Sequence, residues 1–77
     1  MLALHYMTQF ENLIKESKII EKALYEDAGI VHRTWKKRLL EPWKLTCEEV
    51  VNISKILRIE PAELFKLISD DFSNTNS

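Results

Sequence analysis

The sequence predicts a single small all-α domain built from five short helices. Apolar residues recur at spacings of three and four along most of the chain, and helix start and stop residues separate these runs. One glycine and two prolines among 77 residues argue against a turn-rich β fold, and the apolar content argues against disorder. The chain falls well short of the roughly 150 residues of a typical domain, which excludes a second core.

The first two helices are predicted from their amphipathic spacing. Phe10 opens an apolar stripe within residues 8–18, and the polar residues between its members would face solvent. The same spacing resumes over residues 20–28 and predicts the second helix. Gly29 follows at once, and glycine ends helices because it adopts the left-handed backbone conformation at little cost. We therefore expect a short turn at Gly29.

A third helix is predicted directly after this turn. Val31, Trp35 and Leu39 recur every four residues, which places them on one face of a helix over residues 32–40. A proline lies within residues 41–44 and disfavours helix there. This segment is therefore expected to be a loop.

Two further helices are predicted from their first residues. Thr46 and Glu49 match a capping box in front of an apolar run, which predicts a fourth helix over residues 46–57. Pro61 is placed like a first-turn proline, and the apolar positions after it predict a fifth helix ending near Ser69.

The expected organisation is a flexible N-terminal extension at residues 1–7, a helical domain at residues 8–69 and a frayed polar tail at residues 70–77. The apolar start lacks a basic region and a small-residue cleavage site, so we do not interpret it as a signal peptide. Met1 and Met7 both stay open as the natural start.

Composition limits the classes of function. Cys47 is the only cysteine, which excludes an internal disulfide and a cysteine-based metal site and fits a cytoplasmic location. No apolar run approaches the roughly 20 residues needed to cross a bilayer. The sequence shows no carboxylate pair, nucleophile and base pair, glycine-rich phosphate loop or metal-ligand spacing. We therefore expect neither an enzyme nor a cofactor, a metal or a small-molecule substrate.

The charge distribution is more informative than the net charge of -1. Residues 32–44 carry five basic residues and a single acidic one. These are Arg33, Lys36, Lys37, Arg38 and Lys44 against Glu41. Helical geometry places His32, Arg33, Lys36 and Lys37 on one face about 140° wide, away from the apolar stripe. A local positive charge on an otherwise acidic body would orient the approach of a polyanion.

Residues spread over positions 10–68 match a known family pattern. They are Ala23-Leu24, Ala28-Gly29-Ile30, Thr34-Trp35, Arg38-Leu39, Pro42, Thr46, Glu48-Glu49 and Pro61-Ala62-Glu63-Leu64. In these residues the chain resembles helix-turn-helix proteins of the Cro and lambda-repressor type, especially short phage or prophage regulators. The resemblance implies a lambda-repressor-like DNA-binding domain that regulates transcription, acts as a repressor and docks its third helix on double-stranded DNA.

The resemblance also implies where the DNA contacts lie. Base and phosphate contacts map to His32, Arg33 and Lys36 at the start of the third helix, with Lys37 beside them. The fork of Arg33 matches the O6 and N7 of guanine, whereas Lys36 and Lys37 suit phosphates as point charges. His32 suits a base edge or a phosphate. For Thr34 three roles stay open, namely packing, capping or contact with a phosphate.

The chain departs from the family pattern at two positions. Tyr25 stands where the family prefers alanine, so its ring must tilt outward or widen the helix crossing. Val31 replaces the usual serine or threonine cap, which removes an acceptor worth about 1 kcal/mol. Trp35 is expected in the core. Trp43 is expected to cover the core, with a dimer or DNA contact left open. Arg38 is expected either to face DNA or to pair with Glu41 or with an acidic residue of a neighbouring helix.

A second class of function stays open at this point. Helix-turn-helix folds also serve as protein-interaction modules that do not bind DNA. In this chain the interaction surface would be formed by apolar positions of the fourth and fifth helices. These positions are Val50, Val51, Ile56, Phe65 and Leu67. A homodimer is compatible with either interpretation.

Overall fold

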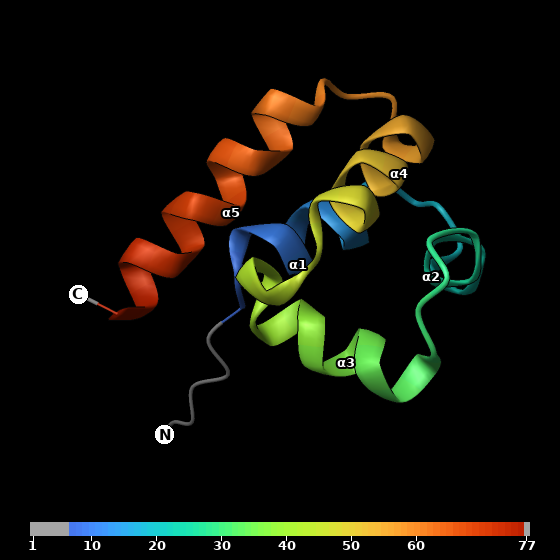
Figure 1. The fold of residues 1–77 in the computed structure, drawn as a ribbon, viewed down its shortest axis with the longest axis horizontal. Coiled ribbons are helices and arrows are strands. Elements are labelled where there is room, and N and C mark those ends of the chain that lie inside the picture. Colours follow the sequence, from blue (N-terminus) through green and yellow to red (C-terminus); the bar gives the residue numbers. More distant parts are fainter. Residues whose placement is uncertain (1–6, 77) are drawn as a thin grey trace.

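The computed structural model describes residues 7–76, and the side chains of residues 7–75. Within this range the chain is all-helical, as predicted (Figure 1). The elements are α1 (Gln9–Glu16), α2 (Glu21–Asp27), α3 (His32–Leu40), the 3-10 helix η1 (Pro42–Lys44), α4 (Cys47–Leu57) and α5 (Pro61–Asn76). The first four α-helices begin and end within two residues of the predicted bounds, which is the usual precision of helix ends.

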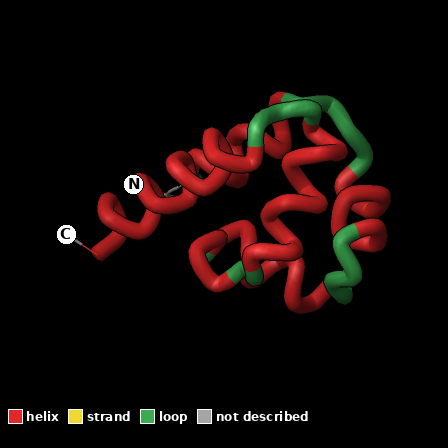
Figure 2. The backbone as a smooth tube through the Cα atoms, turned by 45° about the horizontal axis from the view of Figure 1, so that its top comes forward, coloured by secondary structure: helices red, strands yellow, loops and turns green. Residues whose placement is uncertain are grey.

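The helices enclose one core, with α1 in contact with both α3 and α5. In Figure 1, α5 runs along one edge of the molecule, and α2 and α3 lie on the other side of α1. Figure 2 shows that loops are confined to the connections between helices. None of the helices within residues 7–76 has the length and apolar character needed to span a lipid bilayer.

The core gathers the apolar faces of all five α-helices. Its buried members are Phe10, Ile14, Leu24, Ile30, Trp35, Leu39, Leu45, Val50, Ile53, Leu64 and Ile68. Trp35 is only 1% exposed and meets the ring of Phe10 edge to face, with 6.0 Å between the ring centroids. The prediction that Trp35 points inward is confirmed.

Threonine side chains cap α1 and α4. The Oγ1 atom of Thr46 accepts the backbone N–H of Glu49 at 3.1 Å, and the Glu49 carboxylate accepts the N–H of Thr46 at 2.9 Å, which confirms the predicted capping box. Thr8 accepts the N–H of Glu11 at 3.0 Å and donates to the carbonyl of Leu39 at 2.7 Å. Thr8 therefore joins the start of α1 to the end of α3.

The prediction that helix five ends near Ser69 was wrong, because α5 continues to Asn76. Residues 70–76 are helical, so the prediction of a frayed polar tail was wrong for them too. Asp71 is 0% exposed, and its carboxylate accepts the backbone N–H groups of Gln9 and Phe10 at 2.8 and 2.9 Å. This contact with the start of α1 stabilises the added turns of α5, and composition alone does not reveal it.

Residues 42–44 form the 3-10 helix η1, not a plain loop, because Pro42 fixes a backbone angle suited to a helical first turn. Trp43 is half-buried, and its ring meets that of Phe72 on α5 edge to face, with 5.5 Å between the ring centroids. Residues 1–6 of the predicted flexible extension lie outside the described residues, and Met7 precedes α1 as an exposed residue.

Candidate nucleic-acid interface

The segment from α2 to α3 contains two short helices joined by residues 28–31. Gly29 has a φ of +76°, as its predicted role requires. The N–H of Ile30 donates to the carbonyl of Tyr25 at 2.8 Å, and the N–H of Gly29 to that of Glu26 at 3.1 Å. This pair of bonds is the Schellman arrangement that closes a helix on a left-handed residue. It turns the chain from α2 into α3, where the buried Ile30 anchors the turn in the core.

The ring of Tyr25, a residue of α2, packs against residues of α3. The ring is half-buried. Its centroid lies 5.5 Å from that of His32 and 5.9 Å from that of Trp35, and the ring planes are tilted in both pairs. Because His32 is exposed, the tyrosine ring reaches from the core towards the surface. It thereby helps to position the first residue of α3.

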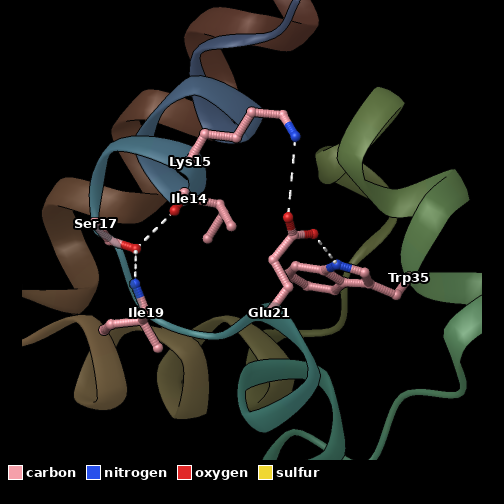
Figure 3. Close-up of polar contacts among 6 residues, drawn as sticks. All are labelled: Ile14, Lys15, Ser17, Ile19, Glu21 and Trp35. Carbon is pink, nitrogen blue, oxygen red and sulfur yellow. Dashed lines mark hydrogen bonds and ion pairs between the residues drawn. The ribbon is translucent and has the colours of Figure 1, made fainter.

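Glu21 links three helices, and sequence reasoning missed it. Its Oε1 atom accepts the indole N–H of Trp35 at 3.0 Å, and its Oε2 atom lies 3.9 Å from the Nζ of Lys15 (Figure 3). Nearby, Ser17 donates to the carbonyl of Ile14 at 2.6 Å and closes the end of α1. A buried indole N–H normally has an acceptor, so Trp35 was the signal that a carboxylate or carbonyl must be close.

The predicted DNA-contact residues lie on a different face of α3 from the buried Trp35, as helical geometry requires. His32, Arg33, Lys36 and Lys37 are all exposed, whereas Trp35 on the same helix is buried. Thr34 is partly buried and lies at the edge between the two faces. The structure therefore brings four of the five predicted residues onto one open face, which we call the basic face of α3.

The side chains of Arg33, Lys36 and Lys37 make no hydrogen bond or ion pair with another described residue. Glu41, the only carboxylate within residues 32–44, pairs instead with Lys44, whose Nζ lies 3.3 Å from its Oε1. Arg38 is partly buried and does not pair with Glu41, one of the acidic partners expected for it. Within the described part of the chain, no carboxylate therefore forms an ion pair with these three basic side chains of the basic face.

Val31 occupies the N-cap position of α3 and provides no side-chain hydrogen bond. Its backbone is extended, with φ of -75° and ψ of 153°, so the helix begins normally without a side-chain cap. The predicted loss of the cap is confirmed.

A cavity of about 260 Å³ lies between α1, α2 and α3, and Lys36 of the basic face is part of its lining. It is lined by Glu11, Lys15, Glu21, Lys36, Leu39 and Leu40. Two carboxylates and two ammonium groups balance one another there, so the cavity has no excess charge that calls for a ligand.

Cys47 is an exposed free thiol at the first turn of α4, remote in sequence from these residues.

Comparison with protein-family models, with curated proteins and with solved structures finds no match for this chain.

Proposed function

We propose that this chain is a sequence-specific DNA-binding regulator of transcription, in which α2, the turn and α3 act as a helix-turn-helix unit. The observation that carries the proposal is the basic face of α3, which is exposed and lacks carboxylate partners within the described residues. In such units the second helix enters the major groove, whose width accepts an α-helix. The buried Trp35 supports this proposal, because it holds α3 rigidly against the core.

Each side chain of the basic face has a distinct role in this proposal. Arg33 reads a guanine through two parallel hydrogen bonds, because its planar fork matches the O6 and N7 acceptors. Lys36 and Lys37 bind phosphates and set the position of the helix without reading sequence. In the same proposal His32 contacts a base edge or a phosphate, and the hydroxyl of Thr34 binds a phosphate.

The charge distribution supports a defined orientation on DNA. The chain carries a net charge of -1, whereas five of the six charged residues within 32–44 are basic. The remainder of the chain is therefore acidic and is repelled by the phosphate backbone. Exposed charges act over roughly a Debye length, about 8 Å at physiological salt, so the basic face leads the approach. The proposal places the protein in the cytoplasm, in contact with double-stranded DNA.

The resemblance to lambda-repressor-type proteins supports a repressor of the short phage or prophage kind that acts as a homodimer. In a dimer on a palindromic site, the two copies of α3 lie about 34 to 36 Å apart, one helical turn of DNA. Light scattering with and without a duplex tests this part of the proposal. A chain that stays monomeric at tens of micromolar, free and on DNA, excludes the palindromic site.

A protein-interaction module is the alternative, and one observation favours it. Phe65 and Phe72 are both exposed on α5, and Leu40 is exposed at the end of α3. Exposed aromatic residues of this kind are typical of protein contacts. Val50, which we expected among the surface positions, is only 2% exposed and belongs to the core, so the candidate surface is narrower than expected.

Binding to DNA at several salt concentrations separates the two functions. The site is first selected from a pool of random duplexes, and the affinity for it is then measured against a scrambled duplex. DNA binding predicts a linear fall of log affinity with log salt, with a slope of about -0.9 for each phosphate contact. Absence of binding to any duplex at low salt, with a folded chain, refutes the proposal and leaves the interaction module.

A further inference from the structure

Four aromatic rings form a continuous series from the core to the basic face of α3. The ring centroids of Phe10 and Trp35 are 6.0 Å apart. Tyr25 continues the series, with its centroid 5.9 Å from that of Trp35 and 5.5 Å from that of His32. Phe10 and Trp35 are buried, Tyr25 is half-buried and His32 is exposed. The series therefore runs outward from α1 to the first residue of α3.

The inner end of this series is held in place. Trp35 is 1% exposed, and its indole N–H donates to the Glu21 carboxylate at 3.0 Å. Side chains in a close-packed core interdigitate in rotamer minima, so Trp35 gives the Tyr25 ring a rigid surface to pack against. The Tyr25 hydroxyl makes no hydrogen bond with another described residue. Packing of its ring therefore positions Tyr25.

The outer end of the series is the imidazole of His32. It forms no hydrogen bond or ion pair with another described residue. Ordering a side chain when it meets a partner costs free energy, and a side chain that is already held in its bound orientation avoids this cost. The ring contact with Tyr25 restricts the imidazole before any partner arrives.

We propose that Tyr25 is a positioning residue for DNA binding, whose ring holds the His32 imidazole in the orientation that contacts DNA. This inference rests on the proposed function. Tyr25 lies on α2 and acts through His32, and it contributes affinity by lowering the cost of ordering the imidazole. The proposal also gives a role to the tyrosine that stands where the helix-turn-helix pattern prefers alanine.

The experiment is a double-mutant cycle measured on the selected duplex. Tyr25→Leu keeps apolar volume beside Trp35 but removes the ring, and it should weaken binding about fivefold, the cost of ordering one side chain (about 1 kcal/mol). In a chain that already carries His32→Ala, the same substitution should have no further effect. In a chain that carries Arg33→Ala, it should still weaken binding about fivefold. A purely structural role of Tyr25 would weaken binding equally in all three chains.

Tyr25→Phe is the conservative control. It keeps both ring contacts and loses only a hydroxyl without a hydrogen bond to the described residues, so it should bind like the parent chain. Thermal denaturation checks that Tyr25→Leu is folded at the assay temperature, and Tyr25→Met takes its place if it is not. Nuclear magnetic resonance of the free parent chain tests the contact without any variant. The Tyr25 ring current should move the imidazole protons of His32 away from their positions in free histidine at the same pH.

Four results overturn the positioning role. They are a loss that is equal in all three chains, a folded Tyr25→Leu that binds like the parent, a Tyr25→Phe that binds as weakly as Tyr25→Leu, and unshifted imidazole protons of His32. In each case DNA binding itself stands. If the folded parent chain binds no duplex, the proposed function fails and this inference fails with it.

Discussion

The Asp71 carboxylate on α5 accepts the backbone N–H of Phe10, which lies 61 positions earlier in the chain, at 2.9 Å. Its other oxygen accepts the N–H of Gln9 at 2.8 Å. The first N–H groups of a helix have no partner within the helix and carry partial positive charge, so a buried carboxylate there satisfies both needs. The two ends of the described chain are thereby joined.

Replacing Asp71 by alanine should lower the free energy of unfolding by about 3 kcal/mol. The change leaves two backbone N–H groups without their charged acceptor, and hydrogen bonds to charged groups contribute about 1.5 to 3 kcal/mol each. Urea denaturation followed by circular dichroism measures the loss. Asp70→Ala is the control, because Asp70 is exposed and should leave the midpoint unchanged. Equal midpoints for both variants would contradict the role given to Asp71.

Glu21 should contribute to stability through its bond to the Trp35 indole. Glu21→Ala leaves a buried indole N–H without an acceptor, which costs about 1 to 3 kcal/mol. Glu21→Gln keeps a carbonyl oxygen, so it should lose less. Thermal denaturation of the two variants checks the order. If alanine and glutamine behave alike, the hydrogen bond does not carry the effect.

Trp35→Ala should lower the free energy of unfolding by about 3 to 5 kcal/mol. The residue is 1% exposed, and its ring contacts those of Phe10 and Tyr25, so truncation leaves a cavity at the junction of α1, α2 and α3. A domain of this size has only about 5 kcal/mol to lose, so the variant should be largely unfolded at room temperature. A nearly unchanged thermal midpoint would contradict the inward orientation.

Gly29 and Arg58 are left-handed residues that end α2 and α4, and substitutions at these two positions should change stability in opposite directions. Gly29 has φ of +76° and nothing within 4 Å of an added Cβ, so the cost of Gly29→Ala is backbone strain alone, about 1 kcal/mol. Arg58 holds φ of 62° with a side chain, so Arg58→Gly should stabilise by about 1 kcal/mol. Chemical denaturation of both variants tests the pair. A stabilised Gly29→Ala would refute the argument.

Arg33→Ala and Lys37→Ala should weaken DNA binding in different ways. Loss of a bidentate base reader should cost about 1 to 3 kcal/mol on the preferred site and relax base choice at one position. Loss of a phosphate contact should weaken all sequences alike and reduce the log-log salt slope by about one unit. Titrations of preferred and scrambled duplexes at several salt concentrations measure both effects. Variants that bind like the parent would mean that the basic face is only solvated.

The local features of this protein were determined by the sequence itself. The Thr46 and Glu49 capping box, the turn at Gly29 and the absent cap at Val31 depend on residues within a few positions of one another. The separation of Trp35 from the basic face follows from helical periodicity alone. These features involve short-range geometry, which residue type and spacing define.

Only the tertiary structure decided the contacts between distant segments. A polar composition predicted a frayed end at residues 70–77, yet the buried Asp71 extends α5 by capping α1. Glu21 is recognisable as the acceptor for Trp35 only once α2 and α3 are placed side by side. Periodicity shows which face of a helix is buried but not which helix covers it. The partner of a polar group therefore depends on the packing of the whole chain.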